Sequence, residues 1–188
     1  MSDAKKIMEM IKEHDITYVD LRFTDIAGKM QHVTQHIDTI DEDALNEGFM
    51  FDGSSIAGWK AINESDMTLM PDLYRAYVDP FFAQPTLALF CDVLEPSSGE
   101  AYDRDPRGTA KAALAHIETL GIADTAFFGP EAEFFVFEDV KIDVSMNRAM
   151  YQVDSVEGPY NGATDYPEGN MGHRPGVKGG YFPVPPLD

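Results

Sequence analysis

Cysteine, tryptophan and basic residues are scarce in this chain of 188 residues, and the shortages exclude several kinds of protein. A single cysteine, Cys91, excludes an internal disulfide, and its place in the apolar run 87–91 predicts a buried structural thiol. Only 14 lysines and arginines accompany 33 acidic residues, which gives a formal net charge of -19. Because nucleic acids and anionic membrane surfaces repel so acidic a protein, we expect neither as a partner.

Long apolar runs are also missing. No stretch of about 18 apolar residues is present to span a bilayer. Residues 1–14 have neither the apolar core nor the small-residue cleavage site of a signal peptide. We therefore expect a cytoplasmic protein. Hydrophobic residues make up 44% of the chain, which is enough for a soluble globular protein with a buried core.

Hydrophobic periodicity predicts a small α+β unit over about the first hundred residues, with one or two short helices and about four strands. The elements that the pattern places are helices at 3–13 and 41–47, a hairpin of strands 17–23 and 30–35, and a central strand at 86–94.

A segment rich in helix and strand breakers, 95–100, follows this unit. We place the division of the chain into two domains directly after residue 103. Asp105 and the proline that follows it suit the start of a helix over 106–120, which Gly121 would end.

The remainder of the chain has few predicted elements from which to build a core. The apolar segment 125–137 predicts a strand, whereas glycine and proline recur without apolar periodicity over 157–186. One helix and one strand are too few to form a closed two-layer core. We therefore expect the chain to be a fragment, or to depend on partners.

The most informative motif is Phe-Asp-Gly-Ser-Ser at 51–55, with a second block, Glu-Ser-Asp, at 64–66. Asp, Gly and Ser are turn formers, and loops on a rigid scaffold often carry function. A plain surface turn is the alternative interpretation. Trp59 lies between the two blocks, where we expect it to be exposed.

A second motif places two glutamates, Glu131 and Glu133, in the apolar segment Gly-Pro-Glu-Ala-Glu-Phe-Phe. In a strand these side chains would lie on one face, about 6.6 Å apart. Buried carboxylates need a partner, and oxygen-rich sites suit Mg²⁺ or Mn²⁺. The spacing favours two neighbouring ions over one shared ion. A strand end whose glutamates reach solvent is the alternative.

These motifs, together with Gly-His-Arg-Pro at 172–175 and Lys-Gly-Gly-Tyr-Phe at 178–182, resemble those of glutamine synthetases, most closely the bacterial type I enzymes. The order and spacing of the motifs agree over nearly the whole chain. The resemblance implies an α+β fold, with a β-grasp-like N-terminal domain at 1–103. The truncated start of a catalytic α/β domain would follow at 104–188.

The resemblance also implies a reaction, which is ATP-dependent formation of glutamine from glutamate and ammonium through γ-glutamyl phosphate. Asp52, with Ser54 beside it, would attract and deprotonate ammonium, and Tyr181 would help to form the ammonium pocket. Glu131 and Glu133 would bind different divalent ions, Mg²⁺ or Mn²⁺, in a site with two or more ions. For Tyr181, an aromatic ring packed between loops is the alternative interpretation.

In this family the loop that carries Asp52 serves the active site of the neighbouring subunit. The resemblance therefore implies a ring-shaped homo-oligomer with active sites between subunits. The remaining metal ligands and the residues that contact nucleotide and phosphate are absent from the sequence. We therefore expect no activity from the isolated chain.

Several points remain open. None of the five histidines matches the family's metal ligand. His32 and His36 would share one face of a strand without acidic neighbours, which favours a structural role, and His116 would be partly solvated on its helix. Two other functions remain possible, namely a related glutamate–amine ligase and a non-catalytic truncated paralogue that acts as an assembly module.

Overall fold

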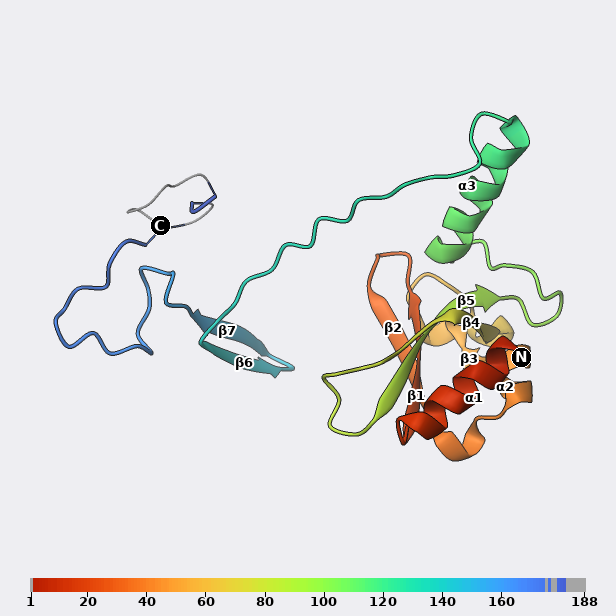
Figure 1. The fold of residues 1–188 in the computed structure, drawn as a ribbon, viewed down its shortest axis with the longest axis horizontal. Helices are drawn as coiled ribbons and strands as arrows, with labels where there is room; N and C mark the ends of the chain where they lie inside the picture. Colours follow the sequence, from red (N-terminus) through yellow and green to blue (C-terminus); the bar gives the residue numbers. More distant parts are fainter. Residues whose placement is uncertain (1, 175, 177–178, 182–188) are drawn as a thin grey trace. The chain divides into compact units, whose positions relative to one another are not determined.

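The computed structural model describes residues 2–174, 176 and 179–181, and the chain forms two compact units, residues 1–127 and residues 128–188. The first unit contains a five-stranded sheet (Figure 1). Its strands lie in the order β2 (Met30–His36), β1 (Tyr18–Thr24), β5 (Thr86–Leu94), β4 (Asp66–Val78) and β3 (Phe49–Asp52). β1 and β5 are parallel, and the other neighbouring strands are antiparallel.

The predicted hairpin and central strand are confirmed by β1, β2 and β5. β3 and β4 were not predicted from the sequence. β3 has only four residues, and β4 contains Pro71, a residue that argues against a strand because it cannot donate to the ladder. The register of β4 against β5 shifts between Pro71 and Ala76, so the strand tolerates the proline at an irregularity.

Two helices confirm the predictions for residues 3–13 and 41–47. α1 (Asp3–Glu13) and α2 (Glu42–Glu47) both pack against β4. The Asp41 side chain caps α2 by accepting a hydrogen bond from the backbone N–H of Ala44 at 2.7 Å. Gly48 ends the same helix at a φ of 86°, where a side chain would be strained.

The core of this unit lies where the helices meet the sheet. Cys91 is 1% exposed, which confirms the predicted buried thiol, and burial raises its pKa. The side chains buried with it are chiefly aliphatic and include Ile7, Ile11, Leu21, Leu45, Leu69, Leu89 and Val93.

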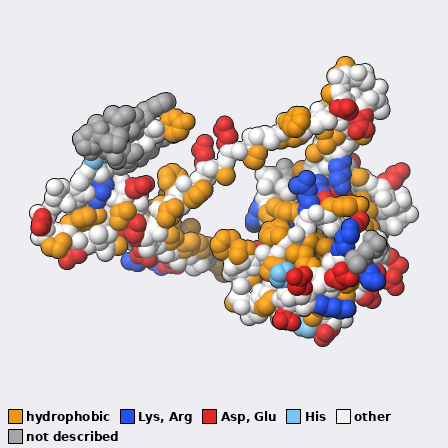
Figure 2. Space-filling view, in the orientation of Figure 1, with side chains coloured by type: hydrophobic (Ala, Val, Ile, Leu, Met, Phe, Trp, Pro, Cys, Tyr) orange, Lys and Arg blue, Asp and Glu red, His pale blue; other side chains and the backbone are white. Residues whose placement is uncertain are grey.

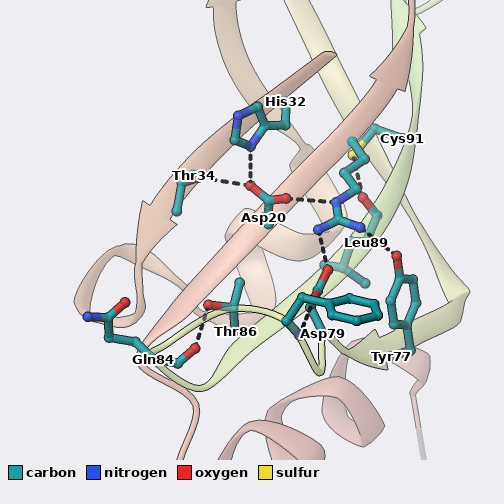
Figure 3. A network of polar contacts seen from close by, with 11 residues as sticks. Asp20, His32, Thr34, Tyr77, Asp79, Gln84, Thr86, Leu89 and Cys91 are labelled. Atoms are coloured by element: carbon teal, nitrogen blue, oxygen red, sulfur yellow. Dashed lines mark hydrogen bonds and ion pairs between the residues drawn. The ribbon is translucent and has the colours of Figure 1, made fainter. Parts of the chain in front are cut away.

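A buried carboxylate, Asp20, organises a polar network on β1 and its neighbours (Figure 3). Its oxygens accept hydrogen bonds from Arg22 Nε at 2.7 Å and Thr34 Oγ1 at 2.8 Å, and lie 2.6 Å from His32 Nδ1. Arg22 also donates to Asp79 at 2.6 Å. The expectation that His32 lacks an acidic neighbour is therefore wrong, because β1 and β2 pair so that Asp20 lies opposite Thr34, two residues along from His32.

We expect Asp20→Ala to lower the free energy of unfolding of the first unit by about 3 kcal/mol, because it removes one of the two carboxylates that pair with the partly buried Arg22 guanidinium and leaves its Nε without a partner. Burial would raise the pKa of Asp20, but the hydrogen bonds from Arg22, His32 and Thr34 outweigh it and hold the pKa below its ordinary value. The stabilisation is therefore complete above about pH 4 and is lost as the pH falls further.

Urea unfolding followed by Trp59 fluorescence at pH 7 and at low pH tests this prediction. The exposed Glu9 of α1 supplies the control variant, Glu9→Ala, which should match the parent. An Asp20→Ala chain as stable as the parent at pH 7 would contradict the importance of the network.

The helix predicted over 106–120 is present as α3 (Pro106–Leu120), within the first unit. The Asp105 side chain accepts hydrogen bonds from the backbone N–H groups of Arg107 and Gly108 in the first turn of α3. Gly121 ends α3 in the left-handed conformation at a φ of 64°. Both ends of α3 therefore lie where the capping signals predicted them.

The second unit contains a hairpin of β6 (Asp139–Ser145) and β7 (Arg148–Asp154), which the sequence did not predict. The strand predicted at 125–137 is wrong, since these residues belong to no helix or strand. Apolar composition makes a segment suitable for a sheet, but a strand also needs a neighbouring strand to complete its backbone hydrogen bonds. The described part of 157–186 contains no helix or strand, as predicted.

The surface is acidic, as the composition requires. Acidic side chains are spread over the face shown in Figure 2 and do not gather into one block. No helix in the described ranges is long and apolar enough to cross a membrane.

Candidate functional site

The carboxylate of Asp52 lies at the end of β3, where the chain turns into a short 3-10 helix, η2 (Gly53–Ser55). One carboxylate oxygen accepts hydrogen bonds from the backbone N–H of Ser54 at 2.8 Å and from its hydroxyl at 2.6 Å. The other accepts from the Ser55 hydroxyl at 3.2 Å. The turn thus presents an exposed carboxylate in a fixed orientation.

These donors also keep Asp52 ionised. Hydrogen bonds from Ser54 hold the pKa of Asp52 below its ordinary value, and the bond from the Ser54 hydroxyl has a larger effect than the bond from its backbone N–H. The structure therefore brings Asp52 and Ser54 together, as the motif indicated. It adds Ser55, which the sequence reasoning did not single out although it is the last residue of the same motif.

The pairing of β3 with β4 explains the second block of the motif. Asp52 lies directly opposite Asp66 in the antiparallel ladder, and the backbone N–H of Gly53 donates to the carbonyl of Ser65 at 2.7 Å. Gly53 must remain small, because a Cβ there would come within 2.3 Å of Met67 Sδ. Residues 64–66 therefore form the end of the loop that follows Asp52, where the chain re-enters the sheet beside β3.

Trp59 is buried, so the expectation of an exposed tryptophan is wrong. Only 6% of its surface is accessible. Its ring packs against Phe23, Phe51 and Tyr102, with centroid separations of 5.6, 6.2 and 5.4 Å. The flanking polar residues suggested exposure, but the loop folds back and places the indole among aromatic side chains.

Glu131 and Glu133 are both exposed, in a segment without regular secondary structure. Carboxylate oxygens are suitable ligands for Mg²⁺ or Mn²⁺. Across the described ranges, however, no group of three or more His, Cys, Asp or Glu side chains could hold a metal ion. The two glutamates therefore fit a metal site as contributors, and the described residues do not complete one.

Tyr181 is 87% exposed. It lies in the unit of residues 128–188 with Glu131 and Glu133, whereas Asp52 and Ser54 lie in the unit of residues 1–127. Two other members of its motif, Lys178 and Phe182, lie outside the described residues. The structure therefore groups the candidate residues into two sets, one in each unit.

Comparisons with known proteins find two matching regions in the chain, and these differ from the two units because the second region begins at residue 103. A family sequence profile described as "Glutamine synthetase, beta-Grasp domain" matches residues 15–96, and one described as "Glutamine synthetase, catalytic domain" matches residues 103–188. Proteins named glutamine synthetase from Azospirillum brasilense and Rhizobium meliloti (strain 1021) are 64% and 61% identical over the whole chain. The chain spans 40% of the length of each of these relatives.

A solved structure shows the same fold. The structure of Plasmodium falciparum glutamine synthetase matches 100% of this chain and 37% of its own, with a TM-score of 0.69 at 23% identity. At that identity the likeness concerns the fold alone. With two profiles that together cover most of the chain, the chain belongs to the glutamine synthetase family, and it carries the β-grasp domain and part of the catalytic domain of that family.

Proposed function

We propose that this chain contributes to an ATP-dependent glutamate–ammonia ligase, which forms glutamine from glutamate and ammonium through γ-glutamyl phosphate. Membership of the family supports the reaction class. The observation that carries the proposal is the exposed Asp52 carboxylate, held as an anion by Ser54 and Ser55. A fixed anion of this kind is suited to collecting a small cation.

The hydrogen bonds to Asp52 have opposite effects on its two proposed roles. They keep the carboxylate charged, which favours attraction of NH₄⁺, and they lower its pKa, which makes it a weaker proton acceptor. We therefore propose that Asp52 acts mainly by its charge. It accepts a proton from NH₄⁺, which frees the nitrogen lone pair, and attack of the resulting NH₃ on the acyl phosphate, with phosphate as the leaving group, draws this unfavourable transfer forward. Tyr181 would complete the ammonium pocket.

Glu131 and Glu133 are proposed to hold separate Mg²⁺ or Mn²⁺ ions, with further ligands from outside the described residues. The ions, when bound, would neutralise phosphate charge during transfer. The part played by this chain is to supply one carboxylate to each site. ATP is a substrate in this scheme.

Membership of the family supports an oligomeric assembly, and the candidate residues lie in two separate units. We propose a ring-shaped homo-oligomer in which the Asp52 loop of one subunit serves the neighbour's Glu131 and Glu133. Because the reaction consumes ATP and glutamate, we place the protein in the cytoplasm.

A hybrid enzyme tests the proposed function. Residues 1–188 of this chain would replace the matching 188 residues of the Azospirillum brasilense protein. We expect the hybrid to form glutamine from glutamate, ammonium and ATP in the presence of Mg²⁺ or Mn²⁺, and the 188-residue chain alone to form none. Electrostatic stabilisation of the transition state requires the whole set of groups.

The outcomes distinguish the alternatives. Glutamine formation by the isolated chain would refute the need for a completed site. A hybrid that prefers an alkylamine to ammonium would indicate a related glutamate–amine ligase. A hybrid that assembles but forms no amide with any amine would favour the non-catalytic assembly module.

A further inference from the structure

The loop between β3 and β4, residues 53–65, is built as a series of linked turns. The backbone N–H of Ile56 donates to the carbonyl of Gly53 at 3.2 Å, and that of Trp59 donates to the carbonyl of Ile56 at 3.1 Å. These bonds connect the position of Trp59 to that of Gly53, the residue next to Asp52. A displacement of the backbone near Trp59 would therefore also displace Asp52.

One feature of the loop permits its conformation and another opposes it. Gly58 adopts a φ of 82°, which glycine tolerates, and a Cβ there would lie 2.9 Å from Ile26 Cδ1. The indole Nε1 of Trp59 is buried and has no hydrogen-bond acceptor within the described part of the chain. An unsatisfied buried donor is costly. The loop therefore needs stabilising contacts from elsewhere in the chain.

Arg104 supplies such a contact from the segment before α3. Its Nη1 donates to the carbonyl of Gly58 and, at 3.3 Å, to the carbonyl of Trp59. Hydrogen bonds from a charged donor are stronger than those between neutral groups. Although the chain has 33 acidic residues, no ion pair of Arg104 occurs among those that the structure describes. Its described polar contacts are therefore with this loop.

The residues on both sides of Arg104 are fixed to the first unit. The Tyr102 ring packs against Trp59 and is 5% exposed. Asp105 is fully buried and accepts from the backbone N–H of Val93 on β5 at 3.1 Å. Arg104 thus extends from a segment that is itself held by the sheet, which makes it a suitable fixed point.

We propose that Arg104 is a positioning residue for the ammonium site. By holding the carbonyls of Gly58 and Trp59, it fixes the loop that orients Asp52. The effect on ammonium rests on the proposed function, whereas the anchoring of the loop does not.

Trp59 allows the anchoring to be measured in the 188-residue chain itself, because it is the only tryptophan. We expect Arg104→Ala to shift Trp59 emission to longer wavelength and to increase its quenching by acrylamide. Arg104→Lys, which retains a charged donor, should lie between the parent and Arg104→Ala. Arg75 is an exposed arginine of β4 whose side chain makes no polar contact within the described residues, and Arg75→Ala is the matched control.

The hybrid enzyme measures the consequence for catalysis. We expect Arg104→Ala to raise the KM for ammonium about tenfold, as the loss of charged hydrogen bonds implies, and to leave the KM values for glutamate and ATP unchanged. Arg104→Lys should recover part of the ammonium affinity, and Arg75→Ala should match the parent. A merely structural role would change enzyme yield or all three KM values together.

Each result is decisive for a stated part of the proposal. Parent-like Trp59 emission and quenching in Arg104→Ala would refute the anchoring. Altered fluorescence with an unchanged ammonium KM would refute the positioning role. If the parent hybrid forms no glutamine, the proposed function fails, and the anchoring is then decided by the fluorescence alone.

Discussion

The hybrid enzyme carrying Asp52→Asn is expected to lose ammonium affinity and to turn over at least about a hundredfold more slowly, while it still binds ATP and glutamate. The amide preserves the shape of the side chain, and its oxygen can still accept the hydrogen bond from the Ser54 backbone N–H. It removes the charge that attracts NH₄⁺ and the ability to accept a proton. Initial rates at varied ammonium, with ATP and glutamate saturating, measure both losses.

A structural role for Asp52 predicts a different result. Asn caps a turn almost as well as Asp, so a residue that only capped η2 would tolerate the change. Trp59 fluorescence of the Asp52→Asn chain should match that of the parent, which shows that the loop is intact. Near-parent ammonium kinetics together with parent-like fluorescence would mean that Asp52 is only a cap.

The lowered pKa of Asp52 also predicts how ammonium affinity depends on pH in the same experiment. Because its pKa lies below the ordinary value of about 3.9, Asp52 stays charged as the pH falls from 7 toward that value. Asp52 should therefore cause no loss of ammonium affinity over this range. A decline in ammonium affinity with a midpoint above pH 5 in the parent hybrid, absent from Asp52→Asn, would contradict the hydrogen-bonded geometry.

Replacement of either Glu131 or Glu133 by Ala is the second change from which we expect a large effect. Each variant of the hybrid should need at least about ten times more Mn²⁺ for activity, because the number of charged ligands sets the affinity for a divalent ion. If the two residues serve different ions, each variant should weaken one class of bound Mn²⁺ and partly spare the other. Mn²⁺ binding isotherms and the Mn²⁺ dependence of rate measure this.

The control for these variants is Glu118→Ala, which removes an exposed glutamate of α3. It should bind Mn²⁺ as the parent does. Parent-like stoichiometry and affinity in both Glu131→Ala and Glu133→Ala would rule out their role as ligands. Identical loss of both classes in each variant would instead favour one shared ion.

A mixture of Asp52→Asn and Glu131→Ala subunits tests whether sites form between neighbours. If each site takes Asp52 from one subunit and Glu131 from the next, random exchange in a ring leaves about one quarter of the sites intact. We therefore expect activity to return on mixing. No recovery in mixed rings of verified composition would place both residues in the same subunit's site.

The sequence determined much of the local structure. Apolar periodicity placed α1 and β1, and the turn after β1 placed β2. A continuous apolar run placed β5, whereas glycines and capping residues placed the ends of α2 and α3. These signals are local, since a helix end or an alternating strand face depends on residues a few positions apart. The motif at 51–55 likewise identified Asp52 and Ser54, which do lie within hydrogen-bond distance.

Tertiary structure decided what depended on contacts between distant residues. β3 becomes a strand because it pairs with β4, and β4 also pairs with β5, whereas the apolar segment 125–137 has no pairing partner among the described residues and stays irregular. His32 meets Asp20 across a β-ladder, and Arg104 reaches the carbonyl of Trp59 across 45 positions of the chain. Trp59 is buried for the same reason, because residues brought together by the fold supply its aromatic neighbours. Residue type and spacing thus indicated which chemistry was present, and only the folded chain showed which groups hold it in place.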